Sequence, residues 1–177
     1  LRLKGEQKMP RPFKGLIHGD TGTGKSTLAK TLSDVCRTLF LCYDTSALYV
    51  YDSLKDKHIV REITSFDQMK EVRNWLIAKG KDEVGAVVVD SVTQGFQKRR
   101  TEFTNSDLDH IAKVQMQQWG HIKEEWRLLI DALVRLPNMH TVFLTVSQRV
   151  TDELDPGTEA RPNYIIIPSI ETGLRNE

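Results

Sequence analysis

The sequence contains the stretch Gly19-Asp20-Thr21-Gly22-Thr23-Gly24-Lys25-Ser26-Thr27, which matches the phosphate-binding loop pattern G-x-x-x-x-G-K-[ST]. Its flanks fit the motif, because residues 13–17 are partly apolar and predict a strand, and residues 26–36 have the apolar spacing of a helix. Strand, glycine-rich loop and helix in this order form the context that the motif requires. The stretch therefore predicts nucleotide binding, and the alternative is a chance match in a glycine turn.

The spacing of this motif has a physical reason. A triphosphate needs many donors that converge on a small volume, and backbone N–H groups converge only where glycines leave room. The helix that follows adds unpaired N–H groups and the positive end of its dipole. We expect Lys25 to reach the β and γ phosphates and the Ser26 hydroxyl to ligate Mg²⁺, so the predicted cofactors are ATP and Mg²⁺.

The composition is that of one ordinary globular domain. With 177 residues, of which 39% are hydrophobic and 28% charged, the chain is long enough to bury a core. The net charge of +1 provides no global field for nucleic-acid binding, which would need a local patch. We expect a flexible, basic arm over residues 1–12 and a nucleotide-binding domain over residues 13–177.

Cysteine content and hydropathy bear on localisation. The two cysteines, Cys36 and Cys42, form no CxxC motif, which argues against a disulfide scaffold or a zinc site and suits a reducing compartment. No apolar run approaches the length of a membrane span, and we find no signal peptide, while Leu1 in place of Met is consistent with a trimmed N-terminus. We therefore expect a cytoplasmic protein without a membrane partner.

A second landmark is Val84-Gly85-Ala86-Val87-Val88-Val89-Asp90-Ser91, a strand of the buried type that ends in an acid. Downstream of a phosphate loop this is the Walker B form, in which Asp90 holds Mg²⁺ or its water opposite Ser26. The alternative is that Asp90 caps a helix. The sequence thus predicts a metal site made by Ser26 and Asp90.

Two further polar residues follow predicted strands. Asp44 ends the apolar strand 38–44, and ligands of open α/β sheets sit beyond that edge, so Asp44 either faces the nucleotide or is a turn aspartate. Gln148 lies near the end of the strand 140–149, where a glutamine can hydrogen-bond the γ phosphate or the attacking water. The candidate catalytic residues are therefore Lys25, Asp44 and Gln148.

The remaining segments complete an alternation of strands and helices. Two further short strands are predicted, at residues 58–63 and 164–168. A helix that begins at a capping box on Ser65 is expected to end at Gly80, and helical spacing over about 106–135 predicts a helix that Gly120 interrupts. This order predicts an α/β fold, a P-loop domain with a mostly parallel central sheet flanked by helices.

Residues 92–108 are less regular and contain a basic run. Lys98, Arg99 and Arg100 lie between two phenylalanines. Such interleaving suits single-stranded nucleic acid, because cations contact phosphates and aromatic rings stack on bases. A solvated charge run explains the same residues equally well.

Two strand ends resemble those of RecA-like recombination ATPases. They are Val88-Val89-Asp90-Ser91-Val92 and Val146-Ser147-Gln148-Arg149, and together with the phosphate loop they are most similar to small phage-encoded nucleotide-binding proteins of the single-strand annealing type. The likeness runs from about residue 13 to residue 170. It implies a RecA-like core in which Asp90 takes the Walker B role and Gln148 senses the γ phosphate.

The resemblance also implies DNA contacts and assembly. Residues 92–104 and 150–163 would match the two loops that face DNA, and the family's filaments imply a head-to-tail homo-oligomer. The candidate DNA contacts are Lys98, Arg99, Arg100 and Arg149. One departure is that no glutamate follows the second strand, where the sequence reads Tyr43-Asp44-Thr45-Ser46-Ala47. Asp44 could take the place of this glutamate, with a shorter side chain. If it does not, hydrolysis would be slow.

The sequence therefore predicts a Mg²⁺-dependent ATP-binding protein and ATPase of RecA-like type, which acts on single-stranded DNA in phage recombination or repair within a bacterial host cell. A small-molecule kinase of the nucleoside or nucleotide type is one alternative, although kinases usually close an arginine-rich lid over the phosphates. The other alternative is a nucleotide-gated assembly module with little hydrolysis, which the missing glutamate motivates.

Overall fold

The central sheet has five parallel strands. The computed structural model describes residues 11–104, 116–151, 157–158, 161–162 and 164–168. Its parallel strands follow the order β1-β5-β4-β2-β3. They are β1 (Lys14–Gly19), β2 (Thr38–Cys42), β3 (Ile59–Glu62), β4 (Ala86–Asp90) and β5 (His140–Thr151). The predicted α/β class with a mostly parallel sheet is confirmed.

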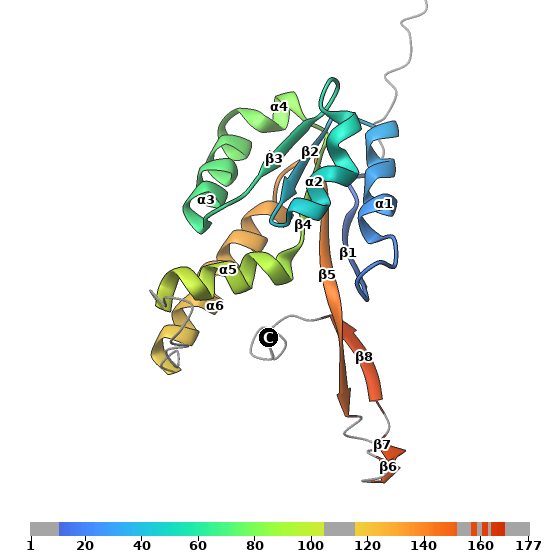
Figure 1. Ribbon diagram of the computed structural model, residues 1–177. Coiled ribbons are helices and arrows are strands. Elements are labelled where there is room, and N and C mark those ends of the chain that lie inside the picture. The colour runs from blue at the N-terminus through green and yellow to red at the C-terminus, as the bar shows by residue number, and fades with distance from the viewer. Residues whose placement is uncertain (1–10, 105–115, 152–156, 159–160, 163, 169–177) are drawn as a thin grey trace, which may run out of the picture.

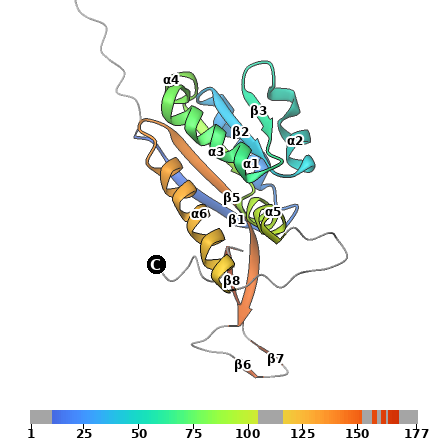
Figure 2. The ribbon, with the colours of Figure 1, turned by 90° about the vertical axis from the view of Figure 1, so that its left-hand side faces the viewer.

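Helices cover both faces of this sheet (Figures 1 and 2). One face carries α1 (Lys25–Lys30), its continuation η1 (Thr31–Asp34), α2 (Thr45–Tyr51) and η2 (Asp52–Leu54). The other face carries α3 (Phe66–Trp75), α5 (Val92–Thr104) and α6 (Met116–Val134). The chain therefore forms three layers, with the sheet in the middle.

The two central strands explain why the layers form. Every residue of β2 and β4 is buried, and nearly all are apolar, so both strands need cover on both faces. Alternate residues point to opposite faces. Leu39, Leu41, Val87 and Val89 pack with α3, α5 and α6, whereas Phe40, Cys42 and Val88 pack with α1 and α2.

The helix that starts after Ser65 runs further than predicted. Ser65 caps α3, since its hydroxyl accepts the Gln68 N–H at 3.2 Å, as the capping box predicts. The expected end at Gly80 is wrong, because a π-helical segment, η3 (Leu76–Gly80), leads directly into α4 (Lys81–Glu83). A Cβ on Gly80 would lie within 3 Å of the Trp75 and Leu76 side chains, so this glycine permits close packing and does not end the helix.

The region expected to be irregular is helical. α5 covers residues 92–104, which corrects the inference that this segment is a DNA-facing loop. Its first turns are fixed by packing, because Val92 and Phe96 are buried and the Phe96 ring stacks on Trp119 of α6. α6 is likewise continuous through Gly120, where no break occurs. Residues 105–115, expected to be partly helical, lie outside the described residues.

β5 is long and extends beyond the parallel sheet (Figure 1). Its last five residues, Ser147–Thr151, pair in antiparallel register with β8 (Tyr164–Pro168), which confirms the strand predicted there. Two short strands, β6 (Gly157–Thr158) and β7 (Arg161–Pro162), pair with each other. The expected loop over residues 150–163 thus contains strand pairing where it is described.

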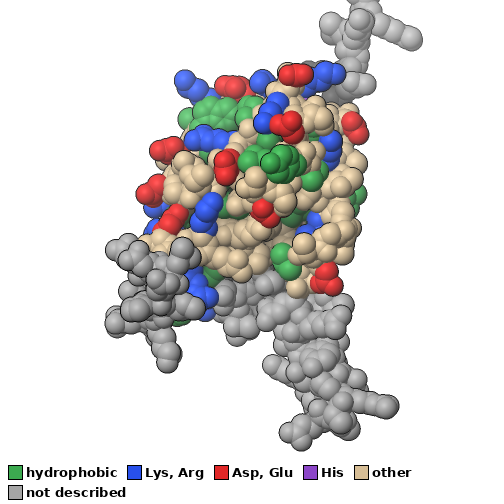
Figure 3. Space-filling view, in the orientation of Figure 1, with side chains coloured by type: hydrophobic (Ala, Val, Ile, Leu, Met, Phe, Trp, Pro, Cys, Tyr) green, Lys and Arg blue, Asp and Glu red, His purple; other side chains and the backbone are tan. Residues whose placement is uncertain are grey.

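The described surface mixes charges of both signs. In Figure 3, lysine and arginine side chains alternate with acidic ones over the visible helices, in keeping with a net charge near zero. In the part of the chain that the structure describes, no helix combines the length and the apolarity needed to cross a membrane.

Candidate nucleotide site

The phosphate loop connects β1 to α1. Gly22 and Gly24 have φ values of 81° and 84°, a left-handed conformation that favours glycine. The Lys25 ammonium folds back over the loop and donates to the carbonyl oxygens of Gly19 and Asp20, each at 2.8 Å. The loop therefore has the curvature of an anion-binding nest, with a cation held at its centre.

Asp90 of β4 lies at this loop, as predicted. Ser26 Oγ donates to Asp90 Oδ2 at 2.6 Å, across 64 positions of sequence. The Asp90 side chain is buried, with 7% of the residue exposed. β5 separates β1 from β4 in the sheet, so the contact forms because α1 brings Ser26 across to the end of β4.

The pocket beside this contact has a volume of about 340 Å³. One wall is the loop and the start of α1, and the other wall is α2. The lining residues are Thr21, Gly22, Gly24, Lys25, Ser26, Thr27, Ser46, Ala47 and Val50. Six of the nine predicted binding residues line it, whereas Gly19 and Asp20 contribute the carbonyl groups that hold Lys25. The remaining one, Thr23, donates its hydroxyl to the Asp20 carbonyl at 2.8 Å.

Sequence reasoning did not assign four described residues to the site, namely Ser46, Ala47 and Val50 of the pocket wall and, at Asp90, Tyr51. The Tyr51 hydroxyl donates to Asp90 Oδ2 at 2.9 Å, and the residue is fully buried. Burial, with the charge of Asp90 as a further cause, raises the pKa of Tyr51 above its usual range, so the hydroxyl stays protonated and remains a donor. The signal available in the sequence was helical spacing, because Ala47 and Tyr51 are four residues apart and share the buried side of α2.

Asp44 has the turn role, one of the two interpretations that the sequence left open, and it is not among the residues that line the pocket. It caps α2, since Oδ1 accepts the Ser46 N–H at 2.9 Å, and it stands beside the pocket wall that Ser46 forms. Its other oxygen, Oδ2, accepts from Gln94 Nε2 at 2.8 Å. The hydrogen bonds from Gln94 and Ser46 hold the pKa of Asp44 below its usual range, so this carboxylate is ionised at neutral pH.

The other catalytic candidate, Gln148, is placed by its strand. Val146 of β5 pairs with Gly19 at the start of the phosphate loop, and Gln148 follows two residues later. Its backbone pairs with Ile167 of β8. The side chains of Gln148 and Arg149 lie outside the described part of the structure.

The residues present fit a Mg²⁺–nucleotide complex. Mg²⁺ in such sites keeps several waters and takes one or two protein oxygens together with phosphate oxygens. Ser26 and Asp90 supply one hydroxyl and one carboxylate at a single point, next to a loop suited to phosphates. Within the described residues, no three His, Cys, Asp or Glu side chains gather into a metal-binding group. The site therefore offers a hydroxyl and a carboxylate as protein ligands, which is the number of protein ligands that Mg²⁺ takes beside phosphates.

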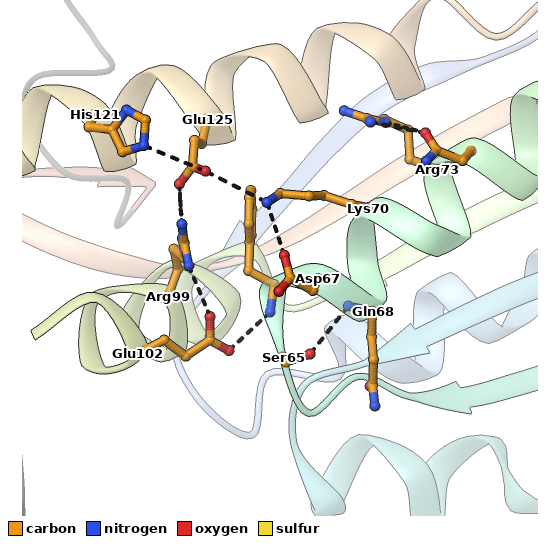
Figure 4. Close-up of polar contacts among 11 residues, drawn as sticks. Ser65, Asp67, Gln68, Lys70, Arg73, Arg99, Glu102, His121 and Glu125 are labelled. Carbon is orange, nitrogen blue, oxygen red and sulfur yellow. Dashed lines mark hydrogen bonds and ion pairs between the residues drawn. The ribbon is translucent and has the colours of Figure 1, made fainter. Parts of the chain in front are cut away.

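The predicted DNA-contacting cations of α5 all have partners in the protein. Figure 4 shows Arg99, whose side chain is 16% exposed, between Glu102 and Glu125, with its shortest bond, 2.7 Å, to Glu125 Oε2. Lys98 Nζ donates to a backbone carbonyl, that of Ile63, at 3.2 Å. Arg100 lies over the Trp119 ring, 5.1 Å from its centroid. Their binding to DNA remains a prediction.

The sequence matches the model of one protein family. The family described as the AAA domain matches residues 11–177, nearly the whole chain. The chain belongs to the AAA domain family. Proteins of this ATPase family generally bind ATP with Mg²⁺. No curated protein matches the sequence of this AAA domain.

Solved structures similar to this AAA domain include an ATPase and a recombinase. An ATPase from the type III secretion system of pathogenic bacteria has 15% identity and a TM-score of 0.49, over 81% of this chain and 48% of that one. The RadB recombinase has 14% identity and a TM-score of 0.48, over 82% of this chain and 66% of that one. The chain thus spans about half the length of the first protein and just under two thirds of the second.

Proposed function

We propose that this protein is a Mg²⁺-dependent ATPase of RecA-like type, which binds ATP at residues 19–27 and acts on single-stranded DNA in phage recombination or repair. The observation that carries the nucleotide part is the contact between Ser26 and Asp90, 2.6 Å long, beside the pocket of the phosphate loop. A hydroxyl and a carboxylate at one point are the ligands that a hard cation takes next to phosphates.

In this proposal the phosphate loop binds the nucleotide, and the Lys25 ammonium changes its hydrogen-bond partners. The ammonium leaves the carbonyl oxygens of Gly19 and Asp20 and contacts the β and γ phosphates, while loop amides donate to the same oxygens. Mg²⁺, when bound, neutralises charge that develops on the β and γ oxygens. Ser26 would hold the metal through its hydroxyl oxygen, and Asp90 would hold it directly or through a water.

Asp44 and Gln148 are the proposed groups for the attacking water. An ionised carboxylate can accept a hydrogen bond from a water and orient it, and the lowered pKa keeps Asp44 ionised. Oδ1 and Oδ2 of Asp44 each accept one hydrogen bond, from Ser46 and Gln94, and each has a second lone pair for a water. The position of Gln148, two residues past the strand pair that includes Gly19, supports a role beside the γ phosphate.

The DNA part of the proposal is supported by the sequence resemblance and by three cations. Lys98 and Arg100 of α5 and Arg149 of β5 are assigned to phosphates of the strand. Arg99 is assigned a supporting role, because its charge is balanced by Glu125 and Glu102. A head-to-tail homo-oligomer would present these residues repeatedly along the DNA.

The test is ATP turnover with and without single-stranded DNA at low salt, where phosphate contacts are strongest. We expect DNA to increase the rate and added salt to remove the increase. Lys25→Ala should abolish turnover, whereas Lys55→Ala, which removes the same charge from an exposed ion pair with Asp52, should leave it unchanged. An equal rate with and without DNA would count against the DNA assignment.

A nucleotide-gated assembly module is the second candidate. The observation that favours it is the state of Asp44, which stands where a glutamate is expected and has both oxygens engaged by Ser46 and Gln94. Tight ATP binding without turnover, with or without DNA, would support this candidate and exclude the first.

A further inference from the structure

Two hydroxyl groups converge on one oxygen of the buried acid. Asp90 Oδ2 accepts from Ser26 Oγ at 2.6 Å and from the Tyr51 hydroxyl at 2.9 Å. The two donors come from different helices, α1 and α2, and both helices lie on the same face of the sheet. The carboxylate is therefore oriented by both helices.

The Tyr51 ring has little freedom to move. It stacks on Phe40 of β2, with ring centroids 4.2 Å apart and planes inclined by 22°. Its helix is anchored at both ends, because Asp44 at the start is bonded to Gln94, and Lys30 of α1 donates to the Val50 carbonyl at 3.1 Å near the end. A hydroxyl on a fixed ring is a donor with a fixed direction.

The two donors differ in their expected role at the metal. Ser26 would ligate Mg²⁺ through a lone pair of its hydroxyl oxygen and could still donate its O–H to Asp90. The Tyr51 hydroxyl is not a predicted ligand, and its ring is fixed by packing against Phe40. Among the described residues, Tyr51 is thus the donor to Asp90 whose position would not depend on the metal.

We propose that Tyr51 is a positioning residue that holds the Asp90 carboxylate in the orientation that Mg²⁺–nucleotide binding requires. The proposal rests on the proposed nucleotide site and deepens it. It assigns α2 two tasks, since this helix also forms the pocket wall with Ser46, Ala47 and Val50. A nucleotide that contacts this wall then contacts the helix that orients the metal's carboxylate.

The test is the Mg²⁺ requirement of nucleotide binding, measured with a fluorescent ADP analogue and no turnover. Tyr51→Phe keeps the ring and removes the hydroxyl. We expect the Mg²⁺ concentration for half-maximal binding to rise about tenfold, the low end of what a hydrogen bond to a charged group is worth. Binding without Mg²⁺ should stay within about twofold, because the loop and Lys25 are untouched.

Tyr43→Phe is the matched control. The Tyr43 hydroxyl is also buried, but it has no hydrogen-bond partner among the described residues, so its removal should leave the Mg²⁺ requirement unchanged. A second comparison uses Asp90→Ala, which removes both acceptor oxygens. If Tyr51 acts through Asp90, Tyr51→Phe in that background should raise the requirement no further.

Each outcome decides a different point. Loss of nucleotide affinity in Tyr51→Phe with and without Mg²⁺ alike would overturn the proposal, because it indicates a general packing role. An unchanged Mg²⁺ requirement in Tyr51→Phe, or an equal rise in the Asp90→Ala background, would also overturn it. Failure of the unaltered protein to bind the ADP analogue would instead refute the proposed nucleotide site.

Discussion

The left-handed backbone of the phosphate loop can be tested with one methyl group. Gly24 has φ 84°, and a Cβ placed on it meets no atom of the described chain within 4 Å. Gly120, inside α6, also has open space around such a Cβ. Gly24→Ala and Gly120→Ala therefore add the same group to open space and differ only in the backbone conformation.

The two substitutions should change stability in opposite directions. An L-residue in the left-handed region costs about 1–2 kcal/mol, so Gly24→Ala should lower the free energy of unfolding by about 1 kcal/mol after the gain from a less flexible unfolded chain. Alanine in a helix interior is more favourable than glycine by about 0.8–1 kcal/mol. Gly120→Ala should therefore raise the free energy of unfolding by that amount. The variants should differ by about 2 kcal/mol, or roughly 4–8 °C in Tm.

The assay is urea unfolding followed by circular dichroism, with Tm as a second measure. Nucleotide binding should weaken in Gly24→Ala, because the loop amides have to shift to relieve the strain, and should be unchanged in Gly120→Ala. Equal stability of the two variants would refute the reasoning, since it would mean that Gly24 is not held in a left-handed conformation.

Two further predictions concern the described ion pairs and histidines. Glu125→Gln should lower the free energy of unfolding by about 1–3 kcal/mol, because it removes the closer of the two carboxylates that pair with the largely buried Arg99 and leaves only Glu102, whereas Glu124→Gln, on an exposed pair, should change it by less than about 1 kcal/mol. Urea unfolding compares them, and equal effects would contradict the prediction. Burial, and then the charges of nearby basic side chains, lowers the pKa of His58, whose Nδ1 accepts the Thr38 N–H at 3.1 Å. The contribution of His58 to the free energy of unfolding should be full above about pH 6.5 and decline as the pH falls below that value. Urea unfolding of His58→Gln over the same pH range should show a smaller decline in the free energy of unfolding.

The nucleotide site was predictable because its chemistry is local to two motifs. The glycines, Lys25 and Ser26 lie in one loop, and Asp90 ends a strand of the same parallel sheet. The carboxyl ends of parallel strands meet at one edge, so a phosphate loop and an acid on such strands come together wherever the sheet forms. The distance from Ser26 to Asp90 follows from this arrangement.

α5 was not predictable from its own residues. Its sequence is polar and basic, and the apolar spacing that indicates a helix is sparse there. The helix is fixed by partners distant in sequence, because Phe96 stacks on Trp119 and Arg99 pairs with Glu125, 26 residues further on. A run of charged residues gives no information about partners that are distant in sequence. The interpretation of residues 92–104 as an irregular loop was therefore wrong.

Tyr51 shows how a cap decides which side chain enters a site. Tyr49 and Tyr51 are two residues apart, so a helix turns them to different sides, but the sequence does not say which one faces inward. The hydrogen bonds of Asp44 fix where α2 begins and therefore how it is rotated. Tyr49 is 78% exposed as a result, and Tyr51 reaches Asp90 with no exposure.

The helix α2 connects the two carboxylates on which the proposed reaction depends. Asp44 at its start is the candidate for orienting water, and Tyr51 at its end orients the candidate metal acid Asp90. Between them, Ser46 and Val50 form one wall of the pocket. A nucleotide that contacts this wall would therefore contact the helix that carries both the donor to Asp90 and the cap carboxylate. In the proposed function the phosphate loop would bind ATP, and hydrolysis would depend on whether Asp44, held by Ser46 and Gln94 at the start of α2, can orient the attacking water.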